Sequence, residues 1–161
     1  MLRILKKNYA GHGIPDEKSK DSFLLPVDGI GGNAQTGYKL SELYSRLSEN
    51  PTKSATVFLD ACFSGSGRNG DVMLASRGVA IKPNVATPKG NYPYHEKGHG
   101  IFTYFLCKKL QETEGNVTLG ELAEYVEDNV YRHSLIENSK AQTPTVNASG
   151  GLLWNWKSIR F

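Results

Sequence analysis

The sequence has little cysteine, no long apolar run and only a small excess of charge. Two cysteines among 161 residues cannot build the disulfide framework that holds small secreted domains together. No stretch is long and apolar enough for a membrane-spanning helix, and residues 1–7 lack the apolar centre of a secretory signal. We therefore expect reduced thiols and a cytoplasmic location.

The charged residues point away from two classes of partner. The net charge is +3, and the lysines are scattered, so a nucleic-acid-binding surface is not expected. Asp16, Glu17 and Asp21 lie close in sequence, but they lack the alternating ligand pattern of a calcium loop. We expect no metal and no cofactor, and the sequence leaves the oligomeric state open.

Length and composition indicate one globular domain covering residues 1–161. Hydrophobic residues make up 39% and aromatic residues 10% of the chain, enough to bury a core. An apolar stripe with helical spacing runs through residues 40–47 and ends at Asn50 and Pro51, and a buried strand is expected over residues 55–62. A helix followed by a strand favours an α/β fold with a mostly parallel sheet.

The second half of the chain predicts two further helices. One begins at Ile101 and ends near Gly115. The other begins after Thr118, which forms a capping box with Glu121. Residues 152–161 read as a final strand. Residues 65–98 read as irregular chain with only a brief apolar run at residues 79–81. So long a loop in a compact domain is functional or disordered.

Two polar residues stand where an apolar run gives way to glycine. Cys62 follows the run of residues 55–61 and precedes Gly65, and His12 lies between Gly11 and Gly13. The carboxyl ends of parallel strands are where reactive groups gather in such sheets. A thiol needs a nearby base to form the nucleophilic thiolate, and His12 is a candidate for that base.

These motifs, YAGHG at residues 9–13 and DACFSG at residues 60–65, resemble those of the caspase-like cysteine peptidases. The histidine precedes the cysteine by 50 residues, which is similar to the caspase spacing. The DAC form is closer to the metacaspase and paracaspase branch. The resemblance implies a mostly parallel sheet flanked by helices and a cysteine endopeptidase that cuts after arginine or lysine.

The resemblance also implies roles for individual residues. His12 and Cys62 would form the catalytic dyad, and the backbone N–H groups of Gly13 and Cys62 would stabilise the oxyanion. Asp60 would line the pocket for a basic substrate side chain, with Asp28 as a second acidic residue there. Some metacaspases require calcium, but Asp16, Glu17 and Asp21 lack the ligand pattern of a calcium loop, so we expect no metal ligand and no cofactor here.

Each of these residues also has an ordinary interpretation. Cys62 alone reads as a small buried residue, His12 as a surface loop residue and Asp60 as a carboxylate that accepts from nearby backbone N–H groups. His99 stands in a rival Gly-His-Gly, but a helix follows it directly, so we interpret it as structural. Cys107 lies in an apolar helical stretch, where burial would keep it unreactive.

The chain departs from the family pattern in two places. The family has two strands before the histidine strand, whereas eight residues precede Tyr9 here, and Lys6, Lys7 and Asn8 interrupt even that strand. No core strand is evident between the cysteine loop and Ile101. We therefore expect a shortened sheet, and the alternative function is a catalytically inactive scaffold or interaction module. A weaker alternative is a thiol hydrolase of non-peptide substrates.

The irregular stretch has one further expected role, as a processing or substrate loop. A protease that cuts after basic residues would cleave it, and autoprocessing is expected at its basic residues, Arg68, Arg77, Lys82 and Lys89.

Overall fold

The computed structural model describes residues 3–16, 19, 21–30, 33–49, 52–62, 79–82, 93–94, 99–139 and 141–161. The N-terminal half contributes β1 (Arg3–Pro15), β2 (Ser22–Leu25), the short 3₁₀ turn η1 (Ala34–Thr36), β3 (Tyr38–Lys39), α1 (Leu40–Glu49) and β4 (Thr52–Cys62). The C-terminal half contributes β5 (Val79–Lys82), β6 (Pro93–Tyr94), β7 (His99–Gly100), α2 (Ile101–Glu112), α3 (Leu119–Asn138), β8 (Thr145–Asn147) and the turns η2 (Gly150–Leu152) and η3 (Trp156–Ser158).

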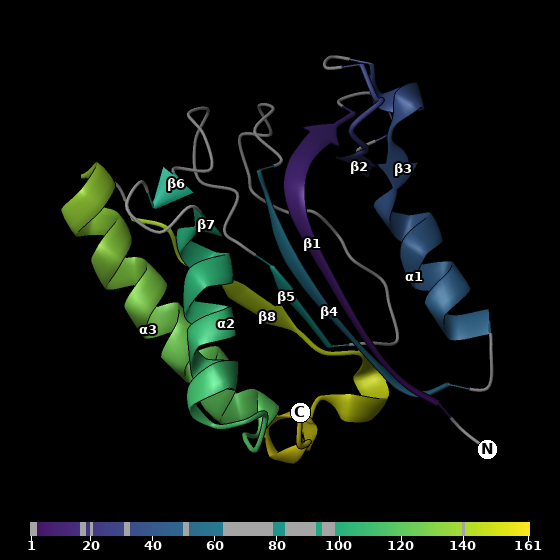
Figure 1. The fold of residues 1–161 in the computed structure, drawn as a ribbon. Helices are drawn as coiled ribbons and strands as arrows, with labels where there is room; N and C mark the ends of the chain where they lie inside the picture. The colour runs from purple at the N-terminus through teal and green to yellow at the C-terminus, as the bar shows by residue number, and fades with distance from the viewer. Residues whose placement is uncertain are drawn as a thin grey trace.

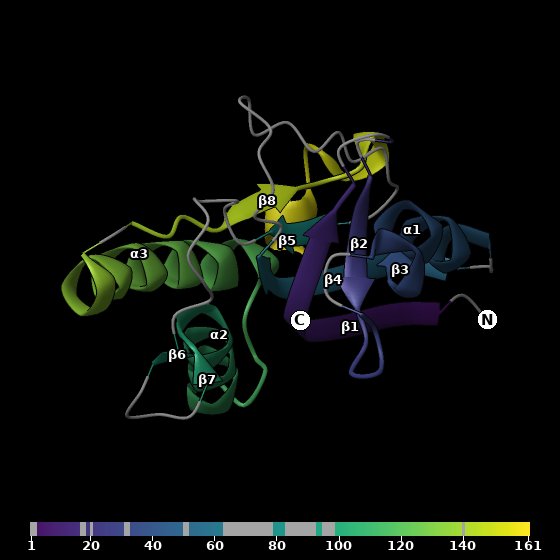
Figure 2. The same ribbon diagram turned by 90° about the horizontal axis from the view of Figure 1, so that it is seen from above.

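Within these residues, six strands form one sheet in the order β3-β2-β1-β4-β5-β8. The three central strands β1, β4 and β5 are parallel, whereas β2, β3 and β8 are antiparallel to their neighbours. The predicted α/β fold is thus confirmed, with a parallel centre and antiparallel margins. Strands β6 and β7 pair separately, beside the N-terminal end of α2 (Figure 2).

The helices cover opposite faces of the sheet, α1 on one and α2 with α3 on the other (Figure 1). Alternation along β4 explains this arrangement, because successive side chains of a strand point to opposite faces. Val57, Leu59 and Ala61 pack in the cluster that includes α1. Phe58 packs in the cluster formed with α2 and α3. Strand β4 is therefore buried on both sides, as its unbroken apolar run predicts.

Strand β1 is 13 residues long, although it contains three consecutive polar residues that predict a break in the strand. The expectation that Lys6, Lys7 and Asn8 interrupt it is wrong, because β1 pairs with β4 continuously from Ile4 to His12. In the described residues β2 joins the other side of β1 only from His12 onward, so this half of β1 has one open edge. Polar side chains are common on such edges, and Lys6 Nζ lies 3.8 Å from the ring centroid of Phe161.

The expectation that no core strand lies in residues 65–98 is also wrong. Strand β5 lies in this interval and pairs in parallel with Thr56, Val57 and Phe58 of β4. A strand therefore exists in the interval where none was evident. The cleavage sites expected at Arg68, Arg77 and Lys89 lie outside the described residues, and Lys82 is the last residue of β5.

The predicted helices are confirmed. The helix of residues 40–47 is α1, and the one that begins at Ile101 is α2. The capping box at the start of α3 joins Thr118 and Glu121 as expected. None of the described helices combines the length and the apolar composition needed to cross a membrane.

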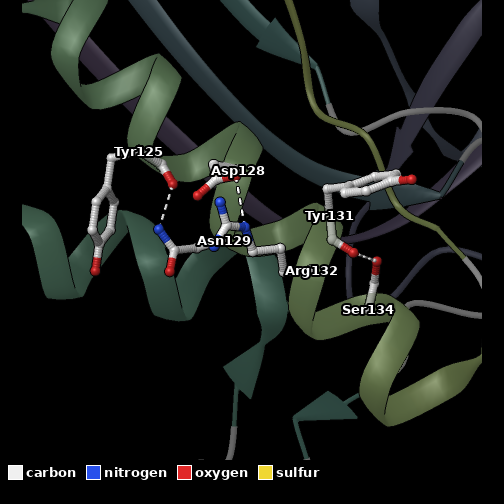
Figure 3. Close-up of polar contacts among 6 residues, drawn as sticks. All are labelled: Tyr125, Asp128, Asn129, Tyr131, Arg132 and Ser134. Atoms are coloured by element: carbon white, nitrogen blue, oxygen red, sulfur yellow. Dashed lines mark hydrogen bonds and ion pairs between the residues drawn. The ribbon is translucent and has the colours of Figure 1, made fainter.

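Helix α3 is fixed by polar contacts along its own length and at its C-terminal end (Figure 3). Arg132 Nε donates to Asp128 at 2.8 Å, and the Asn129 amide donates to the carbonyl of Tyr125. Ser134 is fully buried, and its hydroxyl donates to the carbonyl of Tyr131 and accepts from the backbone N–H of Gln142. These bonds satisfy a buried hydroxyl and hold the segment that leads from α3 into β8.

The expected final strand over residues 152–161 is wrong. Two consecutive turns replace it, with the N–H of Leu152 bonded to the carbonyl of Ser149 and that of Asn155 to the carbonyl of Leu152. Leu153 and Trp154 of this segment are exposed. Its other apolar residues pack, partly buried, against the core cluster of α2 and α3: Leu152, Trp156, Ile159 and Phe161. The last strand is instead β8, which begins directly after Pro144.

Candidate active site

The two residues of the expected dyad are neighbours in the sheet. His12 and Cys62 are Cα partners in the parallel β1–β4 ladder, and they form its last pair. Paired strands lie about 4.8 Å apart, so the backbones of the two residues are adjacent. Both belong to the carboxyl ends of their strands, where the sequence predicts a site. The imidazole of His12 is exposed to solvent.

Tyr9 fixes the backbone around His12. Its hydroxyl lies 2.8 Å from the carbonyl oxygens of both His12 and Leu25, to which it donates. Burial raises the pKa of the Tyr9 phenol, against the lowering effect of the Leu25 hydrogen bond, so the hydroxyl keeps the proton that it donates. Because Leu25 pairs with His12 across β1 and β2, Tyr9 holds both strands at the site.

Gly11 makes room for the Tyr9 ring. A Cβ atom on Gly11 would lie 2.8 Å from the hydroxyl oxygen and 3.0 Å from the Cζ atom of Tyr9, closer than real Cβ contacts. The glycine before His12 therefore leaves space for a ring two residues away on the same face, and a larger residue would displace that ring. The motif analysis gave no role to Tyr9, and its alternation with Gly11 is the signal that was available.

Asp60 lies two residues before Cys62 and faces helix α2. Its residue is 5% exposed, and its Oδ2 accepts from the backbone N–H of Thr103 at 3.2 Å and from the Thr103 hydroxyl at 2.5 Å. Burial raises the pKa of the Asp60 carboxyl, and the two Thr103 bonds partly oppose this rise. The carboxylate thus has the helix-end partners that its ordinary interpretation expects.

Thr103 is the third residue of α2, and Gly100 is its N-cap without any side-chain capping bond of its own. Asp60 fills that role from the neighbouring strand, because an N-cap oxygen normally accepts from the N–H at this third position. A Cβ atom on Gly100 would lie 2.6 Å from Asp60 Oδ2, so glycine is needed for the carboxylate to approach. The sequence analysis missed Thr103 and Gly100 as parts of the site.

The remaining candidates are placed less centrally. Asp28 is exposed in the turn after β2, three residues beyond Leu25, which pairs with His12. Gly13 follows His12 in β1. His99, the rival histidine, belongs to β7 and directly precedes Gly100, so its backbone also lies near Asp60. The structure therefore brings His12, Cys62 and Asp60 to one end of two paired strands and leaves Asp28 on the surface.

The solvent exposure of Cys107 differs from our prediction. We predicted a buried thiol in an apolar stretch of helix, and this is wrong, because Cys107 is free and exposed. The buried residues of α2 are Ile101, Phe102, Phe105 and Leu106, which form one stripe with helical spacing. Cys107 lies outside that stripe and faces solvent.

The acidic residues near the site do not gather around a common point. Asp21 pairs with Lys39 at 2.7 Å, and Asp16 accepts from the hydroxyl of Ser19. In the part of the chain that the structure describes, no group of three or more His, Cys, Asp and Glu side chains could hold a metal ion. Glu17 lies outside that part.

Comparison with known proteins identifies a family whose model covers both motifs. The family model described as "Caspase domain" matches residues 8–150, a span that includes both glycine-flanked motifs and the strands that carry them. No curated protein matches the chain. A match over most of the sequence, together with an α/β sheet that pairs the expected histidine and cysteine positions, shows the family. The chain belongs to the peptidase family defined by the caspase domain.

Proposed function

We propose that the chain is a cysteine endopeptidase that cuts after arginine or lysine, within the metacaspase and paracaspase branch of the family. The observation that carries the proposal is the pairing of His12 with Cys62 at the carboxyl ends of two adjacent parallel strands. Adjacent backbones suit a cysteine and a histidine that act on one peptide bond, since the thiolate attacks the carbonyl carbon and the histidine protonates the leaving nitrogen.

The proposed reaction uses the thiolate of Cys62 as nucleophile. Its sulfur attacks the scissile carbonyl carbon, and the oxyanion that forms accepts from the N–H groups of Gly13 and Cys62. His12 then gives its proton to the leaving amine, and the C–N bond breaks to leave an acyl-enzyme. In the second half, His12 takes a proton from water, which attacks the thioester and releases the thiolate.

Substrate preference is assigned to Asp60. A buried carboxylate two residues before the nucleophile would pair with a guanidinium or ammonium group more strongly than a solvated one. Asp28, exposed on the turn after β2, would add negative charge at the mouth of the pocket. Peptides and proteins with a basic residue before the scissile bond are therefore the proposed substrates.

The dyad is tested by comparing two histidines that share a Gly-His-Gly context. We expect His12→Ala to lower kcat/KM for an arginine peptide by roughly 10²–10⁴-fold, the usual contribution of a general acid–base group. His99→Ala should retain most of the activity. Hydrolysis of fluorogenic peptides with arginine or aspartate before the bond, with Cys62→Ala as the blank, measures both. A larger loss in His99→Ala, or faster cutting of the aspartate peptide, would contradict the assignment.

Thiol labelling of Cys62 must exclude a signal from Cys107, which is free and exposed. We therefore use a Cys107→Ser background, in which iodoacetamide labelling reports on Cys62 alone. Labelling of Cys62 should slow markedly in His12→Ala at neutral pH, because less thiolate forms without the imidazolium beside it.

An exposed free thiol also suits the reducing cytoplasm that we propose as the location.

The non-catalytic alternative has lost part of its support. It depended on two departures from the family pattern. One was the core strand that the sequence did not reveal between Cys62 and Ile101, and β5 occupies that interval. The remaining test is direct, since an inactive scaffold would cut neither peptide above the Cys62→Ala blank.

A further inference from the structure

Thr103 binds the carboxylate that the proposed function assigns to substrate recognition. Its N–H and its hydroxyl both donate to Asp60 Oδ2, at 3.2 and 2.5 Å. A carboxylate oxygen offers about two acceptor sites, so these two donors fill Oδ2. Of the residues that the structure describes, none donates to Oδ1.

Gly100 shows which way the carboxylate is turned. The Cβ position of this glycine lies 2.6 Å from Oδ2 but 3.5 Å from Oδ1, so Oδ2 is the oxygen set against the helix backbone. The positive end of α2 also favours the charged carboxylate in this orientation. Thr103 sets the orientation of the Asp60 carboxylate. Because Asp60 is only 5% exposed, the surrounding packing keeps the carboxylate from rotating away.

We propose that Thr103 is a specificity-determining residue: by occupying Oδ2 it leaves Asp60 a single oxygen with which to recognise a basic side chain. The inference rests on the proposed function of Asp60 as the pocket carboxylate. Arginine exceeds lysine as a carboxylate ligand mainly because its two parallel N–H groups bind both oxygens at once. With Oδ2 filled, that second bond is lost, and lysine and arginine become nearly equivalent substrates.

The experiment compares peptides that differ only in arginine or lysine before the scissile bond. For the wild type we expect the two kcat/KM values to agree within about threefold, because neither side chain gains a second carboxylate bond. Thr103→Val keeps the side-chain shape and the backbone donor but frees one acceptor site on Oδ2. Its arginine-to-lysine ratio should rise by about tenfold, the order expected for one more charge-assisted hydrogen bond.

The matched control is Thr103→Ser, which keeps the hydroxyl and should keep the wild-type ratio. A ratio within one variant is insensitive to the fraction of protein that is folded, so a purely structural role for Thr103 would not change it. The assays are run at pH 8 to favour the ionised form of Asp60, because burial raises the pKa of its carboxyl.

Three results would overturn the inference, and they separate its failure from that of the proposed function. An unchanged ratio in Thr103→Val removes the role of Thr103 alone. A wild-type ratio already above about tenfold does the same without any variant, because it shows that the paired contact forms. If the wild type cuts a citrulline peptide as fast as the arginine peptide, or cuts no peptide above the Cys62→Ala blank, the proposed function fails and this inference fails with it.

Discussion

At the scale of single residues, Tyr44 illustrates the cost of a polar group inside an apolar cluster. The residue is 4% exposed and packs with Leu24, Leu40 and Leu59 between α1 and the sheet. No group in the described part of the chain forms a hydrogen bond with its hydroxyl, and burial raises the pKa of this phenol. The hydroxyl loses its bonds to water on folding and gains none from the residues that the structure describes.

Tyr44→Phe should therefore keep or increase stability, because it removes only the unpaired hydroxyl. We expect the free energy of unfolding to rise by about 1 kcal/mol, the lower end of the cost of an unsatisfied buried group. Tyr44→Leu serves as the control, since it also removes the ring and should destabilise. Urea unfolding at pH 7 measures all three proteins. A loss of stability in Tyr44→Phe would show that the hydroxyl has a partner.

Single residues also show what the sequence could predict of the site. His12, Cys62 and Asp60 are recognisable because their motifs are local and each follows an apolar run. Thr103 and Gly100 are more than 35 residues from Asp60, and their role depends on how α2 docks on the sheet. Cys107 was misread because a run of apolar letters does not reveal which side of a helix is covered; only the stripe of residues 101, 102, 105 and 106 does.

At the scale of elements, the attachment of α2 to the sheet depends on Asp60. The folded-state pKa of this carboxyl is raised, mainly by burial, above its value of about 3.9 in unfolded chains. The folded state therefore holds the proton more tightly. The stability that this contributes is present below about pH 3.9 and is lost as pH rises through the folded-state pKa.

Asp60→Asn should remove this loss, since an amide does not titrate and its oxygen can still accept from the Thr103 N–H. We expect the variant to gain stability relative to the wild type between pH 4 and pH 7, by about 1.4 kcal/mol for each unit that the pKa is raised. Asp60→Ala does not titrate either but also removes the cap of α2, so it should be about 1 kcal/mol less stable than Asp60→Asn at all pH values. Chemical unfolding at a series of pH values tests this, and a constant difference between wild type and Asp60→Asn would contradict it.

The helices could be predicted from local sequence patterns, whereas two of the strands could not. Helices α1, α2 and α3 were predictable because amphipathic spacing and the Thr118 capping box are contained within each segment. Strand β1 was misjudged because Lys6 to Asn8 look unfavourable for a strand, although a polar edge suits them. Strand β5 is four residues long. Its apolar run at residues 79–81 is visible in the sequence but too short to predict a core strand without the partners β4 and β8.

At the scale of the whole molecule, the C-terminal segment closes the face of the sheet that carries α2 and α3. The N–H of Phe161 donates to the carbonyl of Val117, and that of Leu119 to the carbonyl of Ile159. The Phe161 ring lies 6.0 Å from that of Phe58 and beneath the ammonium group of Lys6. The segment thereby links β1, β4 and the start of α3, which lie far apart in the sequence.

Phe161→Ala should therefore destabilise the whole domain and not only its end. The ring is half-buried, so we expect a loss of about 2 kcal/mol, less than the 3–5 kcal/mol typical of a fully buried phenylalanine. Trp154→Ala is the matched control: it removes a larger aromatic from the same segment, but Trp154 is 96% exposed and its loss should change stability by no more than about 0.5 kcal/mol. Thermal and urea unfolding of both variants give the comparison. Equal effects would mean that the segment does not dock on Phe58, whereas a single cooperative transition shifted only in Phe161→Ala would show that docking is part of the global fold.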